Sequence, residues 1–277
     1  MRQPPLDTRN EVKPHTCVLP LLLVLNSRDS IGSSPKHDYL SRPRSLVCLL
    51  TTVLVLFSLG SACAQTSGKA AILEVVGSNA APVAADKLLA LCKQYQMPAS
   101  SVYRWQNHLV VYGPAASIQR LQQPLTAAYR GATVKHYAAP FYKFDRQWCT
   151  DKTVSQQWDN LLLTANLVRD PAKQQEYLRY HATQFELWPE VAAGFCKASF
   201  QQLLVFRNER QLMLVISVPK GASLDELNPK TTENNPRVDE WNARMKQYQE
   251  GIPGTKPGEV WVFLKPVVAP GKTIIKQ

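Results

Sequence analysis

Two stretches, one in each half of the chain, align without gaps, and this internal similarity limits the folds that the chain can adopt. Val102-Tyr103-Arg104 corresponds to Val205-Phe206-Arg207, and Leu109-Val110-Val111 corresponds to Leu212-Met213-Leu214. In each half the two segments are rich in β-branched and apolar residues and flank a short polar turn, which is the pattern of a β-hairpin. An internal duplication is the simplest explanation; a chance similarity between two β-rich patterns is the alternative.

The segments around each hairpin predict the same order of elements in both halves. In the first half we expect a strand at 70–76, a helix at 82–97, the hairpin at 101–112, a helix at 118–129 and a strand at 133–144. In the second half we expect a strand at 161–168, a helical segment at 171–196 that kinks or restarts at Trp188-Pro189, the hairpin at 200–218, a helix at 238–248 and a strand at 260–267. The order β-α-β-β-α-β is that of a ferredoxin-like unit.

The sequence therefore predicts an α+β protein with two tandem ferredoxin-like (βαββαβ) domains, residues 68–146 and 158–268. Each unit has one sheet face that its own helices leave bare, and that face must be covered. The cover can be the other half, which gives an intrachain pseudo-dimer, or a second chain, which gives a homodimer.

Residues 1–64 have the composition of a leader. Arg42-Pro43-Arg44 precedes an apolar run from Leu46 to Gly60, and small residues follow it up to Ala64. This is the pattern of a secretory signal peptide, so we expect a periplasmic or secreted protein. Alternatives are an uncleaved anchor and a lipoprotein with a lipid anchor at Cys63. Residues 1–41 do not fit this pattern, and we expect them to lie upstream of a start near Leu40.

Charge and cysteine content exclude some classes of function. The formal net charge is +11, of which residues 1–64 carry +3 (seven Lys/Arg and four Asp/Glu), and the remaining charge is scattered. A nucleic-acid partner is therefore not expected, because such proteins cluster their basic residues. After the leader only Cys92, Cys149 and Cys196 remain, without metal-ligand spacing. We expect no metal site, and either one disulfide or three thiols.

The stretch 170–191 carries the best candidates for chemistry. Asp170 can cap a helix and Pro171 suits its first position. In a continuous helix Tyr177, His181, Gln184 and Trp188 would share one face. These side chains can bind and protonate a small polar ligand, or they can be half-buried and hydrogen-bonded to neighbours. The first half has no such face on its helix, and His108 and His136 are expected to be surface or strand histidines.

Residues 161–268 resemble the L-rhamnose/L-fucose mutarotase family, a family of dimeric α/β barrels. The resemblance covers the C-terminal half only and rests on four groups of residues: Asp170-Pro171 with Tyr177 and His181; Trp188-Pro189-Glu190; the hairpin Val205-Phe206-Arg207 to Leu212-Met213; and the tail with Asn235-Pro236-Arg237-Val238, Trp241, Met245, Tyr248-Gln249 and Lys256-Pro257-Gly258-Glu259-Val260-Trp261-Val262.

The resemblance implies a dimeric α/β-barrel packing, neither metal nor organic cofactor, and the interconversion of the α and β anomers of a deoxy sugar such as L-rhamnose or L-fucose. Opening a pyranose ring requires proton transfer, and an imidazole can act as acid or base near neutral pH. By resemblance His181 is the catalytic acid/base, while Tyr177, Gln184, Trp188 and Trp241 are substrate-binding residues for a monosaccharide.

Two points stay open in this comparison. Family members have three residues between the histidine and Trp-Pro-Glu, whereas six separate His181 from Trp188 here. Counting from Asp170 places His181 in the catalytic position, and counting back from Trp188 places Gln184 there. The position of a sugar-binding tyrosine in the L-rhamnose enzymes is Leu203, so the sugar is undetermined. A non-catalytic sugar-binding module, or a cofactor-free oxygenase on the same barrel, is the alternative function.

Overall fold

The computed structural model describes residues 69–79 and 81–268. The predictions of a signal peptide, of a start near Leu40 and of a lipid anchor at Cys63 concern residues 1–64, which lie outside the described residues. Within the described ranges, no helix combines the length and the apolar character that crossing a bilayer would require.

The first half contains the elements that its sequence predicts, with a shorter first helix and a second helix that begins earlier than expected. They are β1 (Ala70–Val76), α1 (Asp86–Gln94), β2 (Val102–Trp105), β3 (His108–Pro114), α2 (Ala115–Ala128) and β4 (Thr133–Tyr137). The single strand expected at 133–144 is two strands, because Ala138 and Ala139 separate β4 from β5 (Pro140–Asp145). A 3-10 turn at Ala99–Ser101 precedes β2, and another at Arg146–Trp148 follows β5.

The second half runs through β6 (Trp158–Leu167), α3 (Pro171–Ala182), α4 (Gln184–Leu187), α5 (Pro189–Lys197), β7 (Gln202–Asn208), β8 (Gln211–Pro219), α6 (Leu224–Leu227), a 3-10 turn at Asn228–Thr231, α7 (Pro236–Met245), a 3-10 turn at Lys246–Tyr248, β9 (Gln249–Glu250) and β10 (Val262–Pro266). The long helix expected at 171–196 is therefore three helices. Thr183 ends α3 with a nonhelical ψ of 8°, and Trp188 is nonhelical before Pro189, as expected for a residue that precedes proline.

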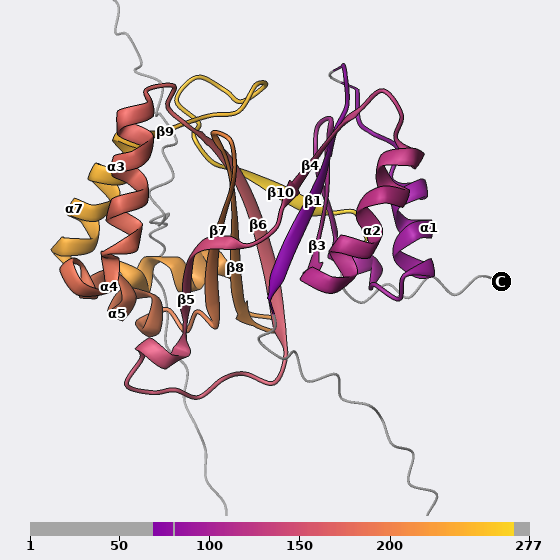
Figure 1. The fold of residues 1–277 in the computed structure, drawn as a ribbon. Coiled ribbons are helices and arrows are strands. Elements are labelled where there is room, and N and C mark those ends of the chain that lie inside the picture. Colours follow the sequence, from indigo (N-terminus) through magenta and orange to yellow (C-terminus); the bar gives the residue numbers. More distant parts are fainter. Residues whose placement is uncertain (1–68, 80, 269–277) are drawn as a thin grey trace, which may run out of the picture.

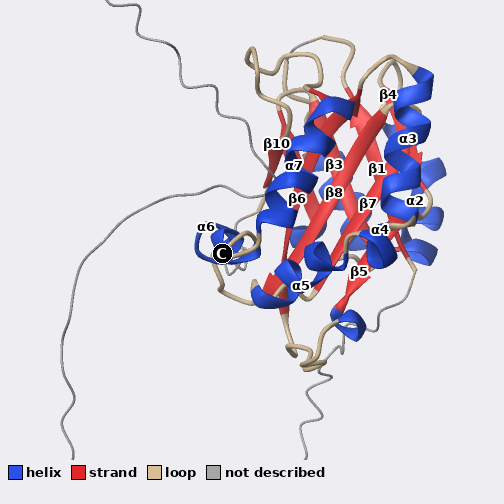
Figure 2. Ribbon diagram, turned by 90° about the vertical axis from the view of Figure 1, so that its left-hand side faces the viewer, coloured by secondary structure: helices blue, strands red, loops and turns tan. Residues whose placement is uncertain are grey.

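The strands form one antiparallel sheet that curves into a nearly closed barrel. Its order is β4-β1-β3-β2-β10-β6-β8-β7-β5, with β9 paired to β6. The helices lie outside it in two layers, with α1 and α2 on one side and α3, α4, α5 and α7 on the other (Figure 1). Figure 2 shows α3, α5 and α7 lying across β6, β8 and β7.

The last strands of the two halves make equivalent connections. β10 pairs with β6 through Val262–Leu264 and then with β2 through Lys265 and Pro266. In the same way, β4 pairs with β1, and the chain continues as β5, which pairs with β7. Each half therefore contributes a strand to the edge of the other half, and these two junctions nearly close the barrel.

The two hairpins that match in sequence also match in structure. Gln106 and Glu209 occupy corresponding turn positions and both have positive φ, 45° and 52°. The matched residues Tyr103 and Phe206, like Val110 and Met213, all belong to the apolar cluster that fills the barrel. Two further clusters, one in each half, join the outer faces of the strands to the helices.

A buried carboxylate links the two halves inside the barrel. Glu74 of β1 is 0 % exposed and accepts hydrogen bonds from Tyr137 Oη at 2.8 Å and Gln211 Nε2 at 2.9 Å. His108 Nδ1 lies 2.7 Å from the same carboxylate. Lys135 Nζ donates to Gln211 Oε1 at 2.5 Å. Because Gln211 belongs to β8, this network fixes the first half against the second. His108 and His136 both lie on strands, as expected.

Candidate functional site

A small cavity of about 20 Å³ lies between the helices of the second half and the sheet that they cover. Its polar lining comes from Tyr142, Tyr177, His181 and Gln249, with Trp241 and Trp261 beside them. The open space is narrow and suits about one or two water molecules rather than a pyranose ring. The space inside the barrel offers no such site, because the central apolar cluster fills it.

Tyr177 and His181 line the cavity from helix α3, and the capped start of this helix sets their positions. Asp170 Oδ1 accepts from the backbone N–H of Ala172 at 2.8 Å, and Pro171 occupies the first turn. These are the start signals that the sequence predicts. Tyr177 and His181 then stand one turn apart, with ring centroids separated by 4.2 Å.

The imidazole of His181 is neutral and oriented. It is 8 % exposed, and burial lowers its pKa to about 4, against the opposing effect of the hydrogen bond to Tyr177. Nδ1 lies 3.0 Å from the carbonyl oxygen of Tyr177. In the neutral ring Nδ1 carries the proton and donates it to that oxygen, so Nε2 is left as an acceptor. Among the described residues, Nε2 has no hydrogen-bond partner.

A relay of side chains orients the Tyr177 hydroxyl. Trp261 Nε1 donates to Gln249 Oε1 at 3.0 Å, and Gln249 Nε2 donates to Tyr177 Oη at 3.2 Å. Gln249 is held in place because β9 pairs with the end of β6. Burial raises the pKa of Tyr177, so its hydroxyl keeps its proton and can donate it in a hydrogen bond.

Gln184 does not line the cavity. It is 0 % exposed, and both ends of its amide have partners: Tyr142 Oη donates to Oε1 at 2.5 Å, and Nε2 donates to the Trp188 carbonyl oxygen at 2.7 Å. The additional residues before Trp188 form α4, a separate turn, so the continuous face expected from the sequence is broken at Thr183. Of the two residues that the two registers place in the catalytic position, His181 lines the cavity and Gln184 does not.

Of the two tryptophans singled out in the sequence, Trp241 lines the cavity and Trp188 does not. Trp188 packs on Trp241 at 5.6 Å between ring centroids, and the guanidinium of Arg237 lies 3.9 Å from the Trp188 ring. Trp188 therefore supports Trp241 from behind. Leu203, where the L-rhamnose enzymes have a tyrosine, is a lining residue, so the cavity lacks that hydroxyl.

Tyr142, Gln249 and Trp261 are site residues that sequence reasoning did not select. Gln249 and Trp261 lie in the tail that carries the family resemblance, and that resemblance could have identified them as site residues. Tyr142 had no such signal, because it belongs to β5 and reaches the second half only through the pairing of β5 with β7.

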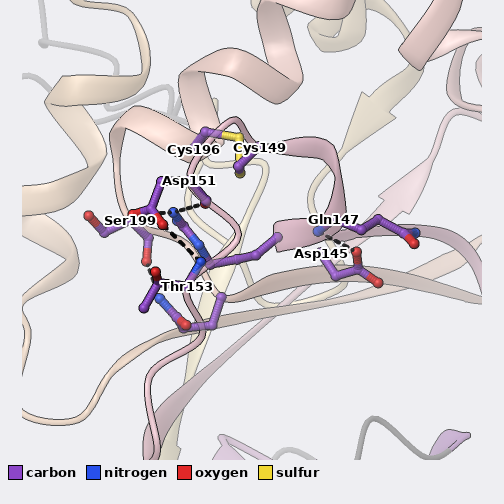
Figure 3. Close-up of a disulfide and its surroundings, with 9 residues drawn as sticks. Asp145, Gln147, Cys149, Asp151, Thr153, Cys196 and Ser199 are labelled. Atoms are coloured by element: carbon purple, nitrogen blue, oxygen red, sulfur yellow. Dashed lines mark hydrogen bonds and ion pairs between the residues drawn. A yellow bond between two sulfur atoms is a disulfide. The ribbon is translucent and has the colours of Figure 1, made fainter.

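A disulfide fastens the segment that follows β5 to the helical layer of the site. Cys149 and Cys196 are bonded with a Cα–Cα distance of 5.5 Å, and Cys196 lies on α5 (Figure 3). Cys92 is a free, buried thiol, and burial raises its pKa to about 11. Of the two alternatives from the sequence, one disulfide is correct. Across residues 69–79 and 81–268, no group of His, Cys, Asp or Glu forms a metal-binding set.

Comparison with known proteins gives the same assignment to the second half. A family model described as L-rhamnose mutarotase matches residues 160–268. An L-fucose mutarotase of Xanthomonas campestris pv. campestris is 32% identical over 102 residues, which cover 36% of this chain and 79% of that protein. The fold and the match define an α+β protein of the mutarotase type. Through its C-terminal half, the chain belongs to the L-rhamnose/L-fucose mutarotase family.

Proposed function

We propose that this protein is a mutarotase that interconverts the α and β anomers of a deoxy sugar such as L-rhamnose or L-fucose. The observation that carries the proposal is the neutral imidazole of His181, whose Nε2 is an unpaired acceptor in a cavity of a chain from this family. The donor hydroxyl of Tyr177 stands beside it.

The imidazole of His181 and the hydroxyl of Tyr177 both take part in the reaction. Nε2 of His181 accepts the proton of the anomeric hydroxyl and passes it to the ring oxygen as the bond between the anomeric carbon and that oxygen breaks, which gives an aldehyde and a free hydroxyl. The Tyr177 hydroxyl donates a hydrogen bond to the ring oxygen while the bond breaks. The aldehyde group rotates about its bond to the next carbon, so that the free hydroxyl attacks the opposite face of the carbonyl. The same proton transfers in reverse then close the ring as the other anomer. Only protons move, so the proposal requires no metal and no organic cofactor.

The walls of the cavity suit a sugar with few hydroxyl groups. Trp241 and Trp261 provide flat apolar surfaces for the C–H side of the ring, and the remaining lining is mainly aliphatic or aromatic. A deoxy sugar leaves fewer hydroxyl groups without partners in such a site than a fully hydroxylated hexose does.

We infer that the two halves are tandem ferredoxin-like units that pair as a dimeric α/β barrel within one chain. The strand orders β4-β1-β3-β2 and β10-β6-β8-β7 are equivalent, and each last strand extends to the other half. In this arrangement the first half is a structural partner that supplies Tyr142 to the cavity. A homodimer is then not needed to complete the barrel, and sedimentation analysis would test this directly.

We further infer that the protein is exported to the periplasm or secreted. The Cys149–Cys196 disulfide supports this, because disulfides persist in oxidising compartments, and the signal-peptide pattern agrees with it. Cell fractionation with mass analysis of the mature N-terminus tests the proposal; a mature protein that retains residues 42–64 in the cytoplasm would refute it. Lipid on Cys63 would identify the lipoprotein alternative.

Saturation-transfer NMR on the anomeric protons of L-rhamnose, L-fucose and D-glucose tests the function. We expect micromolar protein to accelerate exchange of at least one deoxy sugar above the buffer rate and to act less on D-glucose. The additional residues before Trp188, which form α4, favour a second candidate, a sugar-binding module without catalysis. That candidate predicts sugar binding by calorimetry with exchange at the buffer rate for every sugar.

A further inference from the structure

The strand that the first half contributes to the site contains a β-bulge at Phe141. Pro140 pairs with Phe206 and Tyr142 pairs with Val205, so β5 has one residue more than its partner between these two pairs. A bulge can direct neighbouring side chains toward one side of a sheet. Here Phe141 and Tyr142 both contact His181, with ring centroids at 5.7 Å and 5.2 Å. Phe141 also lies edge-on to Tyr177 at 6.2 Å.

Phe141 is the exposed member of the group of rings around His181. Its exposed fraction is 36 %, whereas Tyr142, Tyr177 and Trp241 are all buried at 5 % or less. Phe141 does not line the cavity itself, but its ring lies against that of His181, which does. Phe141 stands on β5, the last strand of the sheet order, which pairs with β7 alone.

The cavity is narrow, so a ligand larger than water needs a side chain around His181 to move. Tyr142 is held by its hydrogen bond to Gln184, and Trp241 is packed between His181 and Trp188. Tyr177 is held by Gln249. The side chain of Phe141 makes edge contacts to the rings of Tyr177 and His181 and has no polar atom to hold it. Moving Phe141 therefore disrupts less than moving any other ring around His181.

We propose that Phe141 is the gate of the site: its ring swings away to admit a monosaccharide to His181 and returns to cover it. The assignment of a sugar rests on the proposed function, whereas the gating of access to His181 does not. The gate is a residue of the first half acting on the site of the second half. It is a positioning residue that controls entry, and it takes no part in proton transfer.

The test measures access to His181 without any sugar. Diethyl pyrocarbonate modifies neutral imidazoles, and mass spectrometry of the peptide that contains His181 gives its rate, with the half-buried His136 as internal reference. We expect Phe141→Ala to raise the rate at His181 about tenfold or more, because local opening is no longer required. The control is Trp148→Ala, since Trp148 is a 49 % exposed aromatic that stacks on Phe185 rather than on His181. The rate of His181 modification in this variant should equal that of the unaltered protein.

An unchanged rate at His181 in a folded Phe141→Ala variant would overturn the gate. Anomer exchange measured on the same variants separates the two proposals. Faster labelling together with no exchange in the unaltered protein would support the gate and contradict the mutarotase proposal. Exchange in the unaltered protein, with labelling and kcat/KM unchanged by Phe141→Ala, would support the mutarotase and refute the gate.

Discussion

Nδ1 of His181 donates a hydrogen bond to the carbonyl oxygen of Tyr177, one helical turn earlier, at 3.0 Å. This contact fixes the tautomer of the imidazole and leaves Nε2 as its basic atom. The partner is a main-chain group of the same helix, so the geometry persists as long as α3 is intact. The same helix places the ring of Tyr177 beside the imidazole, and Gln249 of strand β9 donates a hydrogen bond to the Tyr177 hydroxyl.

The burial of His181 predicts a pH dependence of stability. Its pKa is about 4 in the folded protein, below the ordinary value of 6.5 that it regains on unfolding. Below pH 6.5 the unfolded chain binds a proton that the folded protein does not, so this contribution to stability is present above pH 6.5 and is lost as pH falls toward 4. The loss is roughly 3 kcal/mol. The free energy of unfolding, measured in urea at pH 7.5 and 4.5, should change less with pH in His181→Gln than in the unaltered protein. An equal change in both proteins would show that His181 is not held as a neutral, buried imidazole.

The relay to Tyr177 predicts the effect of removing Gln249. Gln249→Leu deletes the amide that donates to the Tyr177 hydroxyl and accepts from Trp261. We expect kcat/KM for anomer exchange to fall about tenfold, the effect of one hydrogen bond to a reacting group. Gln123→Leu, an exposed position on α2, is the matched control and should leave the rate unchanged. Equal rates for both variants would show that Gln249 does not contribute to anomer exchange.

The sequence predicted those features that depend on local rules. Asp170 and Pro171 start α3, the two hairpins have their expected turns, and Tyr177 and His181 share a face, because capping, turn chemistry and helical spacing are encoded within a few residues. The predicted roles of Gln184 and Trp188 assumed a continuous helix, which ends at Thr183. Tyr142 and Phe141 could not be found in this way, because the pairing of β5 with β7 and its bulge are long-range features.

The network around Glu74 predicts that the two halves stabilise each other. Glu74→Ala leaves the groups of His108, Tyr137 and Gln211 without their shared acceptor. Removing one partner of a buried charged network costs about 3–5 kcal/mol. Urea unfolding should show this loss, whereas Glu226→Ala, at an exposed position of α6, should change stability little. A loss below about 1 kcal/mol for Glu74→Ala would mean that the network does not hold the halves together.

The disulfide predicts a redox dependence of stability. Cys149 and Cys196 are 47 residues apart in sequence, and the chain-entropy model gives a stabilisation of about 4 kcal/mol for a loop of that length. Dithiothreitol should therefore lower the urea midpoint of the unaltered protein. It should have no effect on the double variant Cys149→Ser/Cys196→Ser, which serves as control. An unchanged midpoint in the unaltered protein would show that the bridge contributes nothing to stability.

The central claim is that the imidazole of His181 transfers the proton during ring opening, and the exchange rate of His181→Gln tests it most directly. Glutamine can keep a hydrogen bond to the Tyr177 carbonyl oxygen but cannot act as a base. By saturation-transfer NMR on the deoxy sugar that the unaltered protein turns over fastest, we expect the folded variant to lose about a hundredfold or more of the rate above buffer. A variant that exchanges the anomers as fast as the unaltered protein would contradict the claim.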